Sequence, residues 1–311
     1  MSTKPHTTSL VGILALLVLG GLVIWGVQAL TAGMHGGGAG GGSSAPLRAD
    51  LRDAVLRNDA AAIRAAISNG ADVNLPIPTD EGGRAGMTPL IHACYEGSAD
   101  AVRALIDAKA KTESRTVDGR TALMYAAGWG DANKVRLLLD AGARTDARAS
   151  DGWTALMFAA ARGEVASLRA LTEAGADVQA TNKWRQTALM AAARTGSLEK
   201  VNALLESGAQ AGAADLNGDT ALTIAAANDV PPTILEALVR SGAPIDAPDI
   251  DGVTALMKAA ERGDQAQVQA LLGLGANRAI KDKANGWTAR DWAAKRDDEQ
   301  GRAVVALLDA K

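Results

Sequence analysis

Histidine, cysteine and serine side chains that could do chemistry are sparse and scattered in this chain. The histidines are His6, His35 and His92, and the single cysteine is Cys94. They do not form the closely spaced His and Cys sets that bind a metal. No serine lies in a Gly-x-Ser-x-Gly sequence, and the glycine-rich run that starts at residue 33 is not followed by the Lys-Ser or Lys-Thr of a phosphate-binding loop. We therefore expect no enzyme: no catalytic residues, no metal, no cofactor and no small-molecule substrate.

The other polar candidates have simpler explanations. The acidic run Asp297-Asp298-Glu299 falls in a predicted loop, where solvated charges are the ordinary outcome. Cys94 occupies a position that other repeats give to alanine, so we read it as a small buried apolar residue. The net charge of −3 favours no nucleic-acid partner.

A short sequence motif that begins with threonine recurs along the chain and indicates that the chain is built from repeats. It starts at Thr88, Thr121, Thr154, Thr187, Thr220, Thr254 and Thr288. Successive steps are 33, 33, 33, 33, 34 and 34 residues long. Periods of this length are typical of stacked repeats, in which each unit contacts only its neighbours. The predicted fold is an all-α solenoid.

Each step contains two short amphipathic segments. In residues 121–153 the first apolar cluster includes Leu123, and the second includes Leu138 and Leu139, all of which we expect in the core. The leading threonine can cap the first helix, and a glycine such as Gly142 can end the second in a left-handed conformation. The predicted unit is helix, turn, helix and hairpin loop.

This pattern resembles the ankyrin repeat, which reads Thr-Pro-Leu-His-x-Ala-Ala, Gly, Val-x-x-Leu-Leu, Gly-Ala and then a hairpin with Asp-Gly. The resemblance covers residues 47–311, with an opening cap at 47–86, full repeats starting near 88, 121, 154, 187, 220 and 254, and a closing cap at 288–311. It implies that the first helices and the hairpins line a concave face, while the second helices pack behind them.

Some residues depart from the ankyrin pattern. The position of the family histidine is held by Ile91, Met124, Met157, Met190, Thr223, Met257 and Asp291. We expect thioether packing rather than a polar ladder in that layer. Lys109 and Arg185 stand where glycine is expected, which predicts turns that are strained or differently shaped. Residues 228–232, with two prolines, replace a helix-ending glycine, and we expect the weakest internal joint there. Residues 75–86 lengthen the hairpin after the opening cap.

The N-terminal segment predicts a membrane anchor. Residues 10–30 carry no ionisable side chain, and as a helix they would extend roughly 30 Å, the thickness of a bilayer's hydrocarbon core. We interpret residues 1–8 as a short tail, 9–31 as a transmembrane signal-anchor helix and 32–46 as a Gly/Ser-rich flexible tether. The alternative is a signal peptide cleaved after Ala29, which would release a secreted soluble protein. Secretory apolar regions are usually shorter, about 7 to 15 residues.

The charges around this segment predict its orientation. Lys4 precedes it, and no Lys or Arg follows until Arg48, which favours a cytoplasmic N-terminus. The composition and layout look bacterial, so we expect a single-pass protein of the inner membrane with its repeats in the periplasm. The third alternative is that the repeats face the cytoplasm.

A partner protein is expected on the concave face. The resemblance implies that partners are gripped by the hairpin tips and by the residues before the glycine that ends each first helix. Trp and Arg, which are enriched among residues that carry binding energy, recur at these positions. The candidate partner-binding residues are Tyr95, Glu96, Arg120, Tyr125, Trp129, Trp153, Phe158, Arg162, Gln186 and Arg194. The competing interpretation is that the aromatic residues simply pack within the stack.

Overall fold

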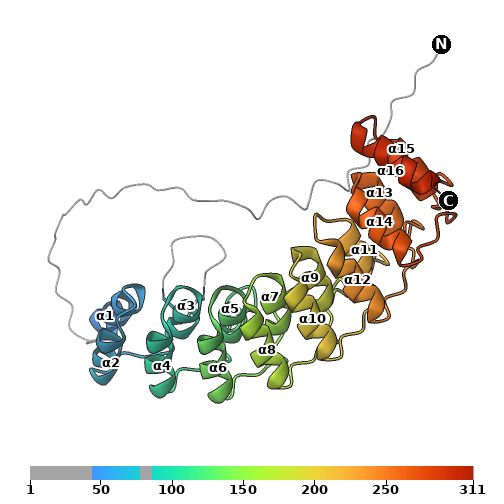
Figure 1. Cartoon of the computed structure of the whole chain (residues 1–311). Helices are drawn as coiled ribbons and strands as arrows, with labels where there is room; N and C mark the ends of the chain where they lie inside the picture. Colours follow the sequence, from blue (N-terminus) through green and yellow to red (C-terminus); the bar gives the residue numbers. More distant parts are fainter. Residues whose placement is uncertain (1–43, 78–85, 311) are drawn as a thin grey trace, which may run out of the picture. The chain divides into compact units, whose positions relative to one another are not determined.

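The computed structural model describes residues 44–77 and 86–310, which form helices arranged in pairs. The helices are α1 (Ser44–Leu56), α2 (Ala60–Ser68), α3 (Pro89–Glu96), α4 (Ala99–Asp107), α5 (Ala122–Trp129), α6 (Ala132–Asp140), α7 (Ala155–Ala161), α8 (Val165–Glu173), α9 (Ala188–Thr195), α10 (Leu198–Glu206), α11 (Ala221–Ala226), α12 (Pro232–Arg240), α13 (Ala255–Arg262), α14 (Gln265–Gly273), α15 (Ala289–Ala294) and α16 (Glu299–Asp309). The pairs stack in chain order along a curve, so the predicted solenoid is confirmed (Figure 1).

The recurring threonines precede the first helices as N-cap residues, and the predicted side-chain cap forms at each of them except Thr121 and Thr288. The Oγ1 atom accepts the amide N–H of the residue three positions later at 3.2 to 3.4 Å in Thr88, Thr154, Thr187, Thr220 and Thr254. Each bond satisfies a donor that the first turn of a helix would otherwise leave unpaired. The recurring threonine motif is therefore a helix-start signal that depends only on residues of its own repeat.

The layer of methionines does more than pack. The side chains of Met124 and Met257 are at most 1% exposed, and their Sδ atoms accept the backbone N–H of Thr121 and Thr254 at 3.5 Å. In the fifth full repeat Thr223 Oγ1 takes the same bond at 2.8 Å. The expectation of thioether packing is confirmed, and at Met257 the side chain also completes a reciprocal helix cap, because the Met257 N–H donates to Thr254 Oγ1.

The second helices show which leucines belong to the core. Leu138 is 0% exposed and Leu123 is 1% exposed, as expected. The prediction that Leu139 belongs with them is wrong, because this side chain is only half-buried at the edge of the core. Successive residues of an α-helix point about 100° apart, so α6 cannot direct both neighbours into the stack.

Two of the expected glycine positions keep the ankyrin geometry without glycine. Lys109 has a φ of 64° and Arg185 a φ of 62°, in the left-handed region that Gly142 adopts at 81°. These turns are therefore strained rather than differently shaped, since a Cβ atom is unfavourable in that conformation.

The fifth full repeat has a short first helix and a proline-led second helix. Pro232 is the first residue of α12, a position that proline tolerates because it needs no backbone N–H there. The preceding loop is held from the next repeat, because the Gln267 amide donates to the carbonyls of Asn228 and Val230 at 3.0 and 2.9 Å. That the stack of repeats is weakest at residues 228–232 stays a prediction.

Some predicted segments fall outside the described residues. These are the tail, the transmembrane segment, nearly all of the tether, and residues 78–85 of the hairpin insertion. Residues 44–46, which we assigned to the tether, belong to α1, because Pro46 is compatible with the first turn of a helix. Among the helices of residues 44–77 and 86–310, none has the length and apolar composition that a bilayer crossing requires.

The difference between the two leucines of α6 can be measured. We expect Leu138→Ala to lower the free energy of unfolding by about 2 to 5 kcal/mol, because it opens a cavity in a closed core. Leu139→Ala should cost clearly less, since its side chain is already half in water. Urea denaturation followed by circular dichroism compares them, and equal losses would contradict this assignment of the core.

Candidate protein-binding surface

The predicted site residues come from the ends of the first helices and from the hairpins before them. Tyr95 and Glu96 close α3, Trp129 closes α5, and Arg162 follows α7. Arg120, Trp153 and Gln186 are hairpin residues that directly precede a helix-starting threonine. The stacking of successive repeats places these short segments side by side on one face of the solenoid.

Five aromatic side chains meet there and form one continuous group, which we call the aromatic cluster. Its ring pairs are Tyr95–Tyr125 at 5.7 Å, Tyr95–Trp129 at 6.1 Å, Tyr125–Trp129 at 5.5 Å, Trp129–Phe158 at 5.6 Å and Trp153–Phe158 at 5.1 Å between centroids. Edge-on and tilted pairs at these distances are favourable beyond the area that they bury. The cluster joins three consecutive repeats, so the aromatic strip predicted from the sequence exists.

Two arginines lie over the cluster. The Arg162 guanidinium lies 5.3 Å from the Trp129 ring centroid. The Arg120 guanidinium lies 5.0 Å from the Phe158 ring and is also paired with the Asp118 carboxylate at 2.9 Å. Such cation–π contacts orient the charged groups without neutralising them.

Burial divides the cluster into a base and a rim. Tyr125 and Phe158 are each 4% exposed. For these two residues the competing interpretation, that the aromatic rings pack within the stack, is therefore correct. They present almost no surface to a partner, and we assign them a supporting role. Tyr95, Trp129 and Trp153 are half-buried and form the accessible rim. Burial, together with the charge of Asp118, raises the pKa of the Tyr125 hydroxyl, which keeps the base of the cluster uncharged.

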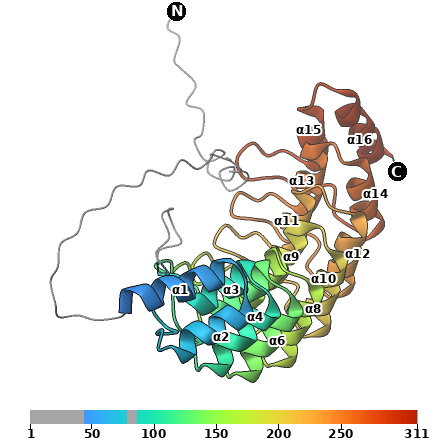
Figure 2. The same ribbon diagram turned by 90° about the vertical axis from the view of Figure 1, so that its left-hand side faces the viewer.

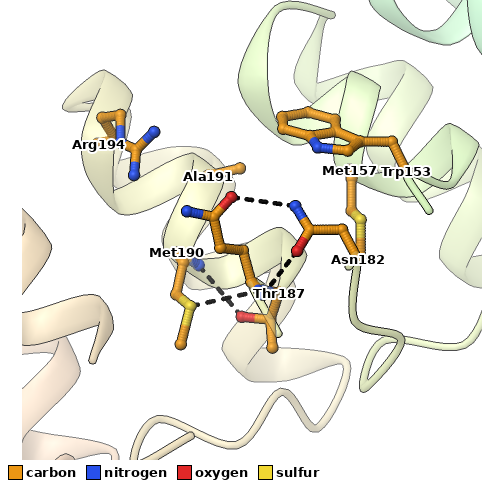
Figure 3. A pocket seen from close by; sticks show the side chains of 8 residues that line it. Trp153, Met157, Asn182, Thr187, Met190, Ala191 and Arg194 are labelled. Carbon is orange, nitrogen blue, oxygen red and sulfur yellow. Dashed lines mark hydrogen bonds between the residues drawn. The ribbon is translucent and has the colours of Figure 1, made fainter. Parts of the chain in front are cut away.

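A small pocket extends this surface into the fourth full repeat. It is lined by Trp153, Met157, Asn182, Gln186, Thr187, Met190, Ala191 and Arg194 (Figure 3). The Asn182 amide donates to Gln186 Oε1 at 3.0 Å. The enclosed volume is about 20 Å³. Ligand pockets are usually at least about 300 Å³ in volume, so this one suits part of a single protein side chain.

The exposed arginines give the surface its charge. Arg162 and Arg194 are exposed, and within residues 44–77 and 86–310 neither makes an ion pair. Glu96 is also exposed, but its carboxylate lies 3.9 Å from His92 Nε2. Of the arginines on this surface, Arg120 is therefore paired with Asp118, whereas the charges of Arg162 and Arg194 are available to a partner.

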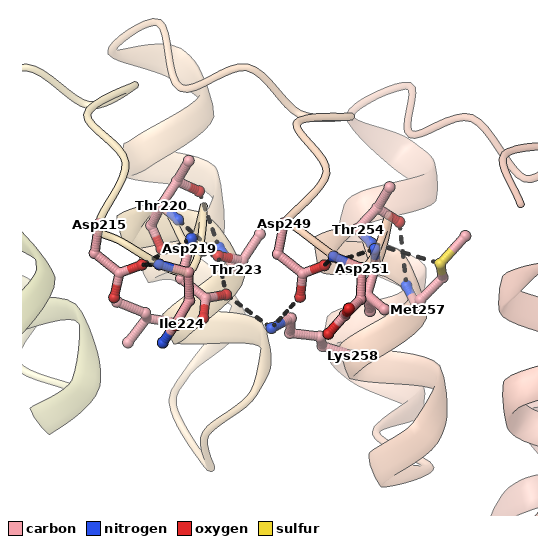
Figure 4. Close-up of polar contacts among 12 residues, drawn as sticks. Asp215, Asp219, Thr220, Thr223, Ile224, Asp249, Asp251, Thr254, Met257 and Lys258 are labelled. Atoms are coloured by element: carbon pink, nitrogen blue, oxygen red, sulfur yellow. Dashed lines mark hydrogen bonds and ion pairs between the residues drawn. The ribbon is translucent and has the colours of Figure 1, made fainter. Parts of the chain in front are cut away.

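A second polar cluster, which our reading of the sequence missed, lies further along the stack. Lys258 Nζ bridges Asp219 Oδ1 at 2.7 Å and Asp249 Oδ2 at 3.0 Å (Figure 4). The other oxygen of Asp249 accepts the backbone N–H groups of Asp251 and Val253 at 3.0 and 2.8 Å. One ammonium group therefore faces two carboxylates, and this end of the surface is acidic.

Comparison of equivalent positions would have revealed this cluster. Lys258 follows Thr254 by four residues, as Tyr125 follows Thr121 and Phe158 follows Thr154. The position four residues after the threonine, which forms one column along the stack, thus holds an aromatic ring in two repeats and a cation in another. In the sequence alone Lys258 is a single lysine without aromatic or arginine neighbours, and the hydrogen bonds that join it to Asp219 and Asp249 exist only in the folded stack.

Cys94 and His92, two of the residues that could do chemistry, are buried side chains of α3. Cys94 is 0% exposed, and burial raises the pKa of its thiol to about 12, so the thiolate is scarce at neutral pH. This confirms the interpretation of Cys94 as a small buried residue. His92 is 9% exposed on α3, where it faces Glu96 of the next helical turn.

Comparisons with known proteins agree with this geometry. A family model described as ankyrin repeats (3 copies) matches residues 51–149, 109–182, 156–249 and 222–311. The chain belongs to the ankyrin-repeat family. Among solved structures, it is similar to the ankyrin repeat domain of Bcl-3, described as a unique member of the IkappaB protein family. That match has 30% identity and a TM-score of 0.61, and it covers 73% of this chain and 100% of the other. A search of curated proteins gave no match.

Membership in this family indicates a protein–protein interaction module. The broad functional prediction from the sequence is therefore confirmed, while the particular contact residues stay predictions. The ankyrin repeats also explain why the surface is built as it is, because each unit contributes the same few positions to one shared face.

The polar cluster gives a prediction that depends on pH. We expect Lys258→Met to lower the free energy of unfolding by about 1 to 3 kcal/mol at neutral pH, because it leaves two carboxylates without their shared donor. Burial alone would lower the pKa of Lys258, but the hydrogen bonds and charges of Asp219 and Asp249 outweigh it, so the pKa in the folded state is raised.

The sign of the pH dependence follows from that shift. Stabilisation by Lys258 is complete below the ordinary lysine pKa of 10.5 and disappears as the pH rises through the raised value. The stability gap between wild type and Lys258→Met should therefore narrow above about pH 10.5. Urea denaturation at a series of pH values measures this gap, and a constant gap would mean that the charge of Lys258 is unimportant.

Proposed function

We propose that this protein is a membrane-tethered scaffold or regulator that holds a partner protein on the concave surface of the second to fourth full repeats. The observation that carries the proposal is the pair of half-buried indoles, Trp129 and Trp153, supported from below by buried rings and flanked by arginines. Immobilised aromatic anchors lose little conformational entropy on binding, and Trp and Arg dominate interface hot spots.

The charge of the surface defines the chemistry of the partner. Arg162 and Arg194 project beside the two indoles and call for carboxylates on the partner. Asp219, Asp249 and Asp251 lie beyond them along the stack and favour a basic residue. A partner segment that is acidic and apolar over the second to fourth repeats, and basic over the fifth and sixth, would match both ends.

The membrane part of the proposal rests on the sequence. Residues 10–30 have the length and composition of a membrane-spanning helix, and residues 32–43 would reach roughly 20 Å as a flexible chain. A bound partner would then be concentrated close to the bilayer. The charge asymmetry around the segment favours a cytoplasmic N-terminus, which in a bacterial inner membrane would place the repeats in the periplasm.

The arginines provide the sharpest test of the binding surface. We expect Arg162→Glu combined with Arg194→Glu to weaken partner binding by at least about tenfold, because the reversed charges repel the acidic partner. The melting temperature should change little, since both side chains are exposed. Affinity capture with the wild-type chain identifies the partner, and titration calorimetry then measures its affinity for each variant.

The matched control for this test is Arg136→Glu on α6. Arg136 is an exposed arginine of a second helix, so its reversal changes the net charge without touching the concave surface. Because Arg136→Glu reverses one charge, it is compared with Arg162→Glu alone and with Arg194→Glu alone, and equal weakening by all three would indicate a general charge effect and would overturn the assigned site.

The anchor is tested by membrane fractionation. We expect the chain to resist extraction by alkaline carbonate and to keep its N-terminal residues, because an apolar segment of this length is costly to remove from lipid. Recovery in the soluble fraction, with a mature N-terminus at Leu30, would establish the secreted alternative. Protease added from outside the inner membrane tells the periplasmic from the cytoplasmic orientation.

A further inference from the structure

The closing cap carries a second group of aromatic side chains, which the candidate surface does not include. The ring centroids of Trp287 and Trp292 lie 5.7 Å apart at an interplanar angle of 80°. Lys295 Nζ lies 5.9 Å from the Trp287 centroid and 5.4 Å from the Trp292 centroid. Edge-on indoles and an ammonium group over aromatic rings attract one another. We call these three residues the cap cluster.

The cap cluster occupies the same positions of its repeat as the aromatic cluster. Trp287 directly precedes a helix-starting threonine, as Trp153 does. Trp292 follows that threonine by four residues, as Phe158 does in its own repeat. The helix of the cap cluster, α15, ends the row of first helices α9, α11 and α13 (Figure 2), and α7 stands before them in the same row (Figure 1). Both clusters therefore belong to the same face of the solenoid.

Folding of the closing cap explains Trp292 but not Trp287. Trp292 packs against the hydrophobic core, and its Nε1–H donates to Asp282 Oδ2 at 2.8 Å. Trp287 is half-buried but does not pack against that core, and within residues 44–77 and 86–310 its Nε1–H has no acceptor. An indole that is held by another ring, and that keeps a free donor, is suited to contact a second molecule.

Lys295 gives the cap cluster a positive charge that is available to a partner. Its basic neighbours are engaged, because Arg290 is paired with Asp309 at 2.6 Å and Arg296 with Asp298 at 2.5 Å. Lys295 is exposed, and in the part of the chain that the structure describes it makes no ion pair. The contact with the indoles orients its ammonium group without neutralising it. A carboxylate beside an apolar side chain is the partner group that matches both features.

We propose that the cap cluster is a second docking site on the concave face, where a carboxylate and an adjacent apolar side chain of the partner bind beside Trp287 and Lys295. This inference rests on the proposed function, because it assigns both clusters to one partner. The polar cluster of Asp219, Asp249 and Lys258, with its excess of negative charge, lies between the two sites. The matching partner segment is therefore acidic and apolar at both ends and basic in the middle.

The separation of the two clusters sets the length of that segment. Four steps from one first helix to the next lead from α7 to α15. Packed helices lie about 8 to 10 Å apart, so the steps add up to roughly 30 to 40 Å. An extended chain covers about 3.3 Å per residue, so about 10 to 12 residues should separate the two acidic groups of the partner.

Fluorine NMR with a defined peptide tests the cap cluster. The full chain is labelled with 5-fluorotryptophan in a non-ionic detergent, and the resonances of Trp153 and Trp287 are assigned by single replacements with phenylalanine. The probe is the acetylated and amidated peptide Asp-Leu-Glu-Leu, and its control is Lys-Leu-Lys-Leu. We expect the acidic peptide to shift both resonances in a saturable way and the basic peptide to shift neither, because the cations beside each indole select carboxylates.

A charge reversal in the cap shows whether the two sites are separate. Lys295→Glu should weaken the peptide affinity reported by Trp287 at least about fivefold and leave the affinity reported by Trp153 unchanged. The matched control is Arg302→Glu, which reverses an exposed charge on α16 of the same cap and should change neither value. Equal weakening by Arg302→Glu and Lys295→Glu would overturn the assigned site. Circular dichroism checks that both variants keep the fold.

Two linked copies of the acidic peptide test the spacing. A linker of about 20 glycine and serine residues can span the two clusters, whereas one of about four cannot. The peptide with the longer linker should bind at least about tenfold more tightly than the single peptide, because the second contact becomes intramolecular. Lys295→Glu should remove this gain. Equal affinities for the two linker lengths would overturn joint binding by both clusters.

The two resonances separate this inference from the proposed function. A shift at Trp153 without one at Trp287 would overturn the second site and leave the proposed function standing. A shift at Trp287 alone would support binding at the cap cluster and refute the surface assigned to the second to fourth repeats. Resonances that both stay unchanged would refute both, and an equal response to the basic peptide would refute the charge selection.

Discussion

Close stacking of small side chains between the first helices is the constraint on which the structure depends. Ala126, Ala159 and Ala192 are all fully buried at equivalent positions. Gly128 shows how little space remains, because a Cβ atom there would lie 3.3 Å from Cβ of Phe158. One helix pair cannot bury its apolar face alone, so the repeats are stable only as an array.

This constraint directs variation to the surface. The positions between adjacent helices are restricted to small or fitted apolar residues, whereas the ends of the first helices and the hairpins remain free to differ. The position four residues after the threonine lies just below that surface and also differs, since it holds the buried Tyr125 and Phe158 in two repeats and the half-buried Lys258 in another. The same backbone supports an aromatic, cationic surface at one end and an acidic cluster at the other (Figure 4).

The local signals in the sequence were reliable where they act within one repeat. The helix-starting threonines and the left-handed Gly142 each depend on a few neighbouring residues, and each was predicted in the right place. Errors arose where burial depends on neighbouring repeats. Leu139 has the composition and spacing of a core residue, but its direction around α6 relative to the adjacent helices leaves it at the edge.

The sequence by itself determined the period, the helix-start signals and the family, because these follow from local hydrogen bonds and from apolar spacing along the chain. Only the tertiary structure decided which residues of the expected aromatic strip are accessible, placing Phe158 in the base and Trp153 on the rim. It also brought Asp219, Asp249 and Lys258 together. Such groupings join residues about one repeat apart, and their distances are set by how the units stack.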